Sequence, residues 1–82
     1  MPWDPMKGER LAPAWTAALE ILSDNEWHSW DEVTEAMLEA SDILPVTCKG
    51  LVYGGIREGV LEKKGRYNQR FKKDHRQLRR AK

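Results

Sequence analysis

The chain has 82 residues, of which 40% are hydrophobic and 33% are charged, and its net charge of +1 is typical of a single soluble globular domain. No apolar run approaches the roughly 20 residues that span a bilayer, and the first residues lack the apolar core of a signal peptide. A single cysteine excludes a framework of internal disulfides, so we expect a protein of a reducing cytoplasm.

Residues 1–10 hold two prolines and a glycine, and we expect them to form an irregular arm ahead of the domain. Trp3 and Met6 are too apolar for a free tail. We expect them to pack on the domain itself, with a second copy of the chain or a protein partner as the alternative.

A first helix follows the arm, because apolar residues recur there at helical spacing. Its apolar face is formed by Leu11, Trp15, Ala18, Leu19 and Leu22. A short strand within residues 26–30 separates this helix from the next. We expect Trp15 and Trp27 to belong to the core, since each buries a large apolar area.

A second helix begins at a capping box, in which Ser29 is the N-cap and Glu32 lies three residues later. Its inner face is formed by Trp30, Val33 and Met37. The acidic residues Asp31, Glu35 and Glu39 are expected to face water.

A third helix is predicted for residues 47–58, with Thr47 near its N-cap and Gly59 just beyond its C-terminal end. At about 100° per residue, one face presents Lys49, Tyr53 and Arg57 in a single exposed row. The opposite, buried face is formed by Cys48, Leu51, Val52 and Gly55.

Glycines make this third helix unusual, because four of the twelve residues 48–59 are glycine. Each glycine inside a helix costs roughly 1 kcal/mol relative to alanine. Gly50 and Gly54 flank the exposed row, where the lack of a side chain favours close approach to another molecule. We expect Gly55 to let this helix cross another helix closely.

The remaining residues 60–80 are strongly basic and predict a β structure. We expect a strand near 60–64, a loop at 65–74 and a return strand near 75–80, with Leu78 directed inward as the only large aliphatic residue after Leu61. The alternative is a tight turn at Gly65–Arg66, with residues 67–73 as the return strand.

Charge divides the chain into two parts. Residues 1–45 carry two basic and ten acidic side chains, a net charge of −8, whereas residues 46–82 carry twelve basic and three acidic ones, a net charge of +9. A strongly basic half is typical of proteins that bind nucleic acid. The alternative is that the two halves pair their charges across the folded surface.

The order of these elements resembles the winged helix-turn-helix family, in particular the small winged-helix proteins of bacteria and their phages. The resemblance covers about residues 11–80 and is carried by the segments EWHSWDEV, TCKGLVYGGIREG and VLEKKG…DHRQLRR. It implies a three-helix domain, mainly α with a small β-wing, between the arm at 1–10 and a basic end at 81–82. It also implies the cytoplasm of a bacterium or of a phage-infected host.

The resemblance further implies a double-stranded DNA-binding protein, either a small transcriptional regulator or a phage control protein. Helix 47–58 would enter the major groove, and the wing at 60–80 would contact the backbone or the minor groove. Carried over by position, the groove-reading residues are Thr47, Lys49, Gly50, Tyr53 and Arg57. The wing and the end of the chain would contribute Lys63, Lys64, Arg66, Arg70, Lys72, Lys73, Arg76, Arg79 and Arg80.

The sequence is also compatible with two other functions. A winged-helix module of this kind could bind a protein partner through its acidic helices 1 and 2 or through its arm. Tyr67 and Phe71, which lie among basic residues, could instead stack on the unpaired bases of RNA.

We expect no enzyme, metal site, cofactor or small-molecule substrate. Cys48 lies on the inner face of its helix, which favours an inert buried thiol. One cysteine with His28 and His75 lacks the spacing of a zinc site. The sequence contains neither a phosphate-binding loop nor partners for a serine nucleophile.

Overall fold

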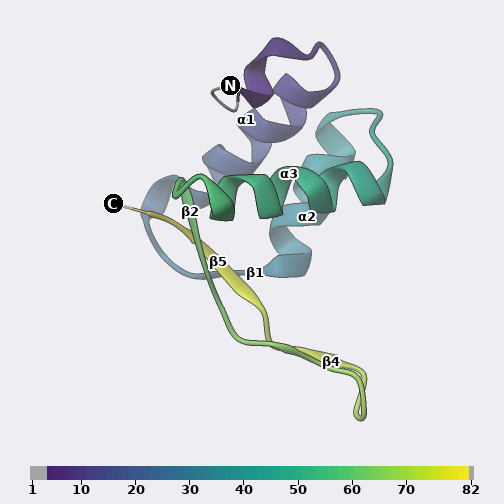
Figure 1. Ribbon diagram of the computed structural model, residues 1–82, viewed down its shortest axis with the longest axis vertical. Helices are drawn as coiled ribbons and strands as arrows, with labels where there is room; N and C mark the ends of the chain where they lie inside the picture. The colour runs from purple at the N-terminus through teal and green to yellow at the C-terminus, as the bar shows by residue number, and fades with distance from the viewer. Residues whose placement is uncertain (1–3, 82) are drawn as a thin grey trace.

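The computed structural model describes residues 4–81, which form three helices and a small antiparallel sheet (Figure 1). The α-helices are α1 (Leu11–Ile21), α2 (Trp30–Ala40) and α3 (Pro45–Arg57). Short 3-10 helices span Pro5–Lys7 and Leu22–Asp24. The strands are β1 (His28–Ser29), β2 (Leu61–Lys64), β3 (Tyr67–Asn68), β4 (Lys73–Asp74) and β5 (Gln77–Arg80).

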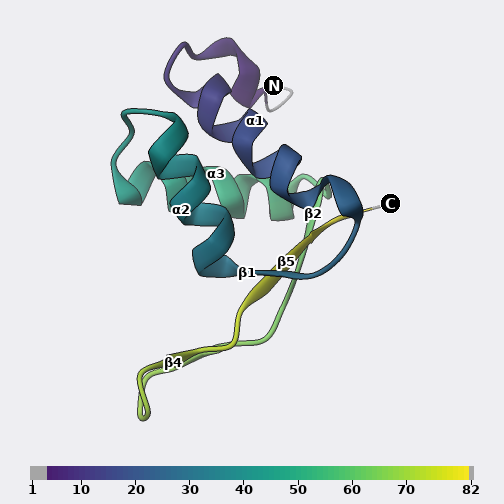
Figure 2. The same cartoon turned by 180° about the vertical axis from the view of Figure 1, so that it is seen from behind.

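The three helices bury one core that extends onto the sheet. Seen from behind, α1 and α2 lie in front of α3, and the strands leave below them (Figure 2). The sheet contributes Leu61 and Leu78, so the expected inward direction of Leu78 is confirmed. The buried hydrophobic residues are Ala14, Trp15, Ala18, Leu22, Trp30, Val33, Met37, Cys48, Leu51, Val52, Leu61 and Leu78.

The second helix begins at Ser29, as expected. The backbone of Ser29 is extended, and its hydroxyl accepts a hydrogen bond of 3.1 Å from the backbone N–H of Glu32. The Glu32 carboxylate does not complete the capping box, because it binds the ring of His28 instead.

The start of α3 differs from the prediction. The helix begins at Pro45, two residues before Thr47, and its N-cap is Leu44, which makes no side-chain cap. Proline fits this first position because its missing N–H has no helical partner there. The backbone N–H groups of Thr47 and Cys48 both donate to the Leu44 carbonyl at 3.0 Å, so Thr47 already lies within the helix. At the other end, Gly59 has a φ of 79° and follows the helix as expected.

The two faces of α3 are separated nearly as the helical period predicts. Gly54 is the exception, since it is buried, whereas we expected it on the exposed flank. It lies only about 60° around the helix from the buried Leu51, and the buried arc extends to it. Gly50 is exposed, and a Cβ added there would meet no atom within 4 Å.

Gly55 lies where α3 crosses α1. A Cβ at this position would come within 2.8 Å of Trp15 Cη2, which is closer than such atoms approach one another. It would also lie 3.0 Å from Leu61 Cδ1, which is a tight contact. The Trp15 side chain is buried in the core, so its ring has little room to move aside. The expectation that Gly55 permits a close helix crossing is confirmed.

The sheet is antiparallel, with the strand order β1-β5-β2. Strands near 60–64 and 75–80 were expected, and β2 pairs with β5 over Leu61↔Arg80 to Lys64↔Gln77. This pairing excludes the alternative of a tight turn at 65–66. Residues 65–74 are not a simple loop, because β3 and β4 form a second short ladder within them.

A single long hairpin therefore carries both ladders. Between them, the His75 backbone N–H donates to the Arg66 carbonyl at 3.1 Å, which keeps the two chains paired. Gly65 has a φ of 81°, and a Cβ there would overlap the His75 carbonyl oxygen. Only glycine fits this bend, beyond which the residues 67–74, here termed the distal hairpin, project away from the helices (Figure 1).

The described part of the arm lies against α1, although Met6 remains 52% exposed. Pro5 is buried, and the Asp4 carboxylate accepts a 3.0 Å hydrogen bond from the Met6 N–H, which caps the first 3-10 turn. The Thr16 hydroxyl of α1 lies 3.9 Å from the Met6 sulfur. Trp3, which we also expected to dock, lies outside the described residues.

We expect Gly50→Ala and Gly55→Ala to change stability in different ways. Both substitutions gain roughly 1 kcal/mol of helix propensity, but only the second forces a side chain against Trp15 and Leu61. Overpacking of this kind costs roughly 1–3 kcal/mol. The free energy of unfolding, measured by urea titration, should be higher for Gly50→Ala than for Gly55→Ala by roughly 1–3 kcal/mol. Equal values would show that α3 does not press on α1 at Gly55.

His28 joins the end of the first helical segment to α2. Its Nε2 lies 2.9 Å from Asp24 Oδ1, and its Nδ1 lies 2.8 Å from Glu32 Oε2. The hydrogen bond with Asp24, and next that with Glu32, raises the pKa of His28 above its ordinary value of 6.5. The Glu26 N–H and His28 in turn lower the pKa of Asp24.

This arrangement predicts a dependence of stability on pH. Because the pKa of folded His28 is raised, its contribution is complete below about pH 6.5 and is lost as the pH rises through the raised value. The melting temperature should therefore fall over that range. His28→Gln should flatten the dependence. A slope that survives in His28→Gln would assign it to another group.

Candidate nucleic-acid interface

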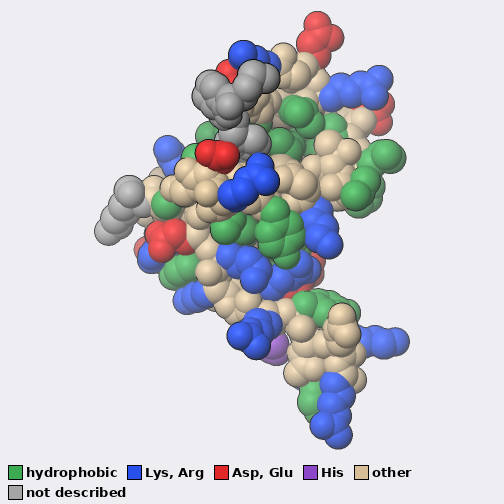
Figure 3. Space-filling model, viewed as in Figure 1, with side chains coloured by type: hydrophobic (Ala, Val, Ile, Leu, Met, Phe, Trp, Pro, Cys, Tyr) green, Lys and Arg blue, Asp and Glu red, His purple; other side chains and the backbone are tan. Residues whose placement is uncertain are grey.

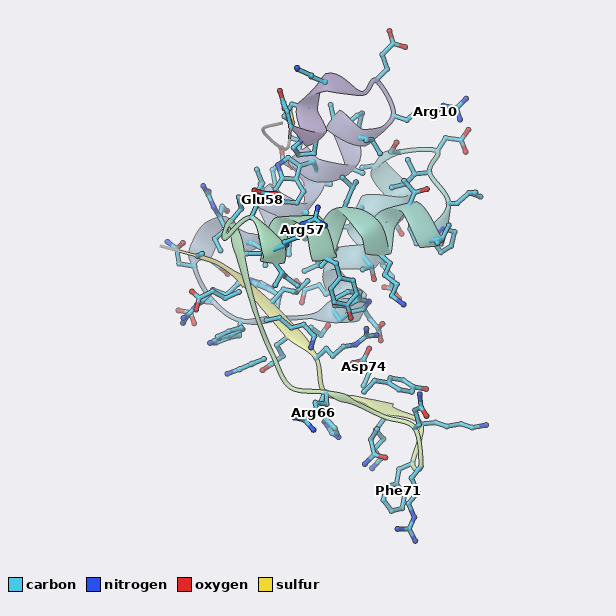
Figure 4. The ribbon with its side chains drawn as sticks, viewed as in Figure 1. Arg10, Arg57, Glu58, Arg66, Phe71 and Asp74 are labelled. Carbon is cyan, nitrogen blue, oxygen red and sulfur yellow. The ribbon has the colours of Figure 1, made fainter. Side chains whose placement is uncertain are left out.

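The exposed face of α3 carries the row expected from the sequence. We use "the α3 row" for Lys49, Tyr53 and Arg57, which are all exposed. Figure 4 shows Arg57 on the side of α3 that faces the viewer. Its only described ion pair is a long one of 3.9 Å with the neighbouring Glu58, so its charge is available to another molecule.

A column of stacked side chains connects the α3 row to the distal hairpin. The Lys49 ammonium lies 5.9 Å from the centre of the Tyr53 ring, which lies 5.3 Å from the Trp30 ring. The Arg76 guanidinium lies 4.0 Å from the Trp30 ring and 5.8 Å from that of Tyr67. Each cation is attracted by the electron-rich ring faces. The column therefore fixes the direction of the hairpin relative to α3.

Arg76 is held within the molecule by Asp74. Its Nε and Nη2 donate to the two Asp74 carboxylate oxygens at 2.9 and 2.8 Å. Both side chains are largely buried, and these hydrogen bonds lower the pKa of Asp74. Because Nε, Nη2 and one face of its guanidinium have partners within the protein, Arg76 has a structural role. The DNA contact expected of it from the sequence stays a prediction.

Trp27 organises a second cluster on the outer face of the sheet. The Lys64 ammonium and the Arg79 guanidinium each lie 4.4 Å from the Trp27 ring. Arg79 also donates to Glu62, its cross-strand neighbour, at 3.3 Å. Trp27 is thus half-buried beneath two cations, and the expectation that it belongs to the core is wrong. A large ring on the outer face of a sheet can be shielded from water by long side chains, here those of Lys64 and Arg79.

The other expected cations of the hairpin are exposed. Figure 3 shows Lys and Arg side chains from the middle of this face to the end of the hairpin, while the visible Asp and Glu lie mainly around the upper half and the left edge. Thr47 is half-buried, and Gly50 lies open beside the α3 row. The exposed cations of the hairpin are Lys63, Lys64, Arg66, Arg70, Lys72, Lys73 and Arg80.

Sequence reasoning missed two apolar side chains at the start of α3. Leu44 is 67% exposed and Val46 is 70% exposed. The signal was present for Val46, because the helical period places it on the same side of α3 as Lys49 and Tyr53. A pocket of about 230 Å³ opens next to them between α2 and α3, lined in part by Thr34, Leu38 and Lys49.

Cys48 is buried beside the Met37 sulfur at 3.7 Å, and burial raises the pKa of its thiol. Within residues 4–81, no three His, Cys, Asp or Glu side chains gather in a way that could hold a metal ion. Over the same range, no helix has both the length and the apolar character needed to cross a bilayer.

Comparison of the chain with models of known protein families, with curated proteins and with solved structures gave no match. The geometry of the α3 row and the hairpin is therefore the basis for assigning a function.

We expect Arg76→Ala to destabilise the protein. The substitution removes two charged hydrogen bonds, leaves the Asp74 carboxylate without its cation and uncovers Trp30. Hydrogen bonds to charged groups contribute about 1.5–3 kcal/mol, and the free energy of unfolding should fall by a similar amount. The exposed Arg66→Ala should change it by less than about 0.5 kcal/mol. Similar losses in the two variants would contradict a structural role for Arg76.

Proposed function

We propose that the protein is a double-stranded DNA-binding protein with the winged helix-turn-helix arrangement. In this proposal α2 and α3 are the helix-turn-helix pair, and the β2–β5 hairpin is the wing. The observation that carries the proposal is the continuous basic surface that begins at the α3 row and reaches the end of the hairpin. A small transcriptional regulator or phage control protein is the biological role that we infer from it.

The shape of α3 suits the major groove. That groove is roughly 12 Å wide and accepts a helix. The α3 row would lie along its floor, where Lys49 and Arg57 could donate to guanine and Tyr53 could contact a thymine methyl group. Gly50 lies beside the row with open space around it, so the backbone could approach the base edges or a phosphate. This closeness would compensate for the helix stability that glycine costs.

The hairpin would add contacts to the sugar-phosphate backbone or the minor groove. Its exposed cations would neutralise phosphates and release counterions, which makes affinity strongly dependent on salt. Arg76 would act indirectly, because its stacking on Trp30 sets the angle between the hairpin and α3. The exposed carboxylates of Asp31, Glu35 and Glu39 on α2 would disfavour docking through that face.

The first test is the binding of the whole chain to random-sequence duplex DNA across a salt series. Lys49→Ala/Arg57→Ala should bind more weakly than the unchanged chain, with a slope of log K against log salt that is smaller by roughly 0.9 for each phosphate that the variant no longer neutralises. A matched control is Lys7→Ala/Arg10→Ala, which changes the net charge equally at exposed positions in the arm. Figure 4 shows Arg10 far from the hairpin.

Gly50→Ala belongs in the same salt series. If α3 lies in a groove, this variant should bind more weakly even though its helix is more stable. Absence of binding at low salt would contradict the proposal. If the two double variants bind equally weakly, net charge alone would explain the binding to DNA. A protein partner for the acidic helices would then be the next function to test.

A further inference from the structure

The end of the distal hairpin carries an aromatic ring that the fold does not use. Phe71 is 65% exposed in the turn between β3 and β4. Figure 4 shows it at the far end of the hairpin, away from all three helices. Its described ring contact is with the Arg70 guanidinium, 5.6 Å from the ring centre. This ring therefore contributes nothing to the core.

The turn holds Phe71 in a defined position. Its backbone N–H donates to Asn68 Oδ1 at 3.2 Å, and β3 pairs with β4 through Tyr67↔Asp74 and Asn68↔Lys73. The next residue, Lys72, adopts a φ of 52°, which closes the turn. A left-handed residue is uncommon outside glycine and marks a specific turn geometry. The ring is thus presented by a hydrogen-bonded tip.

The charges around the Phe71 ring indicate the class of molecule that it contacts. Residues 65–73 contain four basic side chains and no acidic one. Cations alone would satisfy contacts to phosphates, and an exposed phenyl ring adds nothing there. A phenyl ring becomes useful where it can leave water. On duplex DNA a thymine methyl group covers only part of such a ring, whereas the space between two stacked base pairs can enclose all of it.

We propose that Phe71 is an apolar wedge that enters the minor groove, inserts between two adjacent base pairs and bends the duplex. This inference rests on the proposed DNA-binding function and adds a mode of recognition to it. Apolar side chains inserted in this way kink DNA by roughly 20–90° toward the major groove. The narrow two-stranded tip would carry the ring, while Arg70 and Lys72 contact the phosphates on either side.

The wedge also gives the protein a source of sequence preference that hydrogen bonds do not provide. Pyrimidine–purine steps unstack and kink more easily than other steps, whereas A-tracts are stiff. The distal hairpin should therefore favour a TA or CA/TG step at a fixed distance from the segment that α3 contacts.

Stacking on single strands is the competing use of the same ring, and the geometry favours it less. A platform for unpaired bases presents successive free aromatic rings. Here the other aromatic residue of the distal hairpin, Tyr67, lies against Arg76 on the column that leads to α3. Tyr67 is still 46% exposed, but it lies in β3 beside this column, whereas Phe71 alone projects from the tip of the turn. A ring at the tip suits a wedge better than a platform.

The test measures bending and binding in one titration. A duplex of about 25 base pairs with a central TA step carries a dye at each end, and energy transfer between the dyes reports the bend. A second duplex has an A-tract at its centre, and a single strand of the same length is included. The whole chain is compared with Phe71→Ala, with Phe71→Leu as a conservative wedge and with Lys49→Ala/Arg57→Ala as an affinity control.

We expect the unchanged chain to raise energy transfer at saturation, more strongly on the TA duplex than on the A-tract duplex. Phe71→Ala should bind with an unchanged salt slope, because no charge is removed, and should lose the rise in energy transfer. Phe71→Leu should retain most of it. The affinity control should need more protein to reach the same bend. The melting temperature of Phe71→Ala should match that of the unchanged chain.

Each contrary outcome has a separate meaning. Binding without bending, or equal bending by Phe71→Ala, would overturn the wedge and leave the DNA-binding proposal standing. A larger loss of affinity by Phe71→Ala on the single strand than on the duplex would assign the ring to stacking and overturn the wedge as well. Absence of duplex binding at low salt would overturn both proposals.

Discussion

The contact of α3 with α1 at Gly55 is the constraint on which the rest of the structure depends. The Trp15 ring and the Leu61 side chain come within 2.8 and 3.0 Å of the point where a Cβ at this position would lie. Trp15 belongs to α1 and Leu61 begins β2, so one missing side chain sets both the depth of α3 and the point where the hairpin leaves the core. The exposed row of α3 and the basic hairpin consequently share one side of the molecule (Figure 3).

Local periodicity made much of this fold predictable. The two faces of α3 follow from the 3.6-residue repeat, and β5 was located through Leu78, which is the only large aliphatic residue available to anchor the chain end. The errors arose where local signals compete or where partners are distant. Thr47 is a good capping residue, but Pro45 is a better first residue of a helix. Gly54 lay at the margin of the buried arc, where small shifts in packing decide exposure.

The exposure of most candidate residues was predictable from the sequence, but which of them the protein uses internally was not. A basic segment indicates a charged surface, yet it does not show which cations the protein uses internally. Arg76 is occupied by Trp30, which lies 46 positions earlier in the chain, and Arg79 by Trp27 and Glu62. Such pairings join distant segments and have no periodicity that a sequence pattern could reveal. The exposed Phe71 was visible in the sequence, but its isolation at the tip required the hairpin.

The separation of the two faces of α3 has a consequence for how such a protein can diversify. Val46, Gly50 and Arg57 take no part in the core, while Cys48 and the other inner residues on the same helix are fully occupied with packing. Substitutions at the outer positions can therefore accumulate without destabilising the fold. Descendants of this chain could acquire new surfaces on α3 through single changes, and a combinatorial library restricted to these positions would consist mostly of folded members.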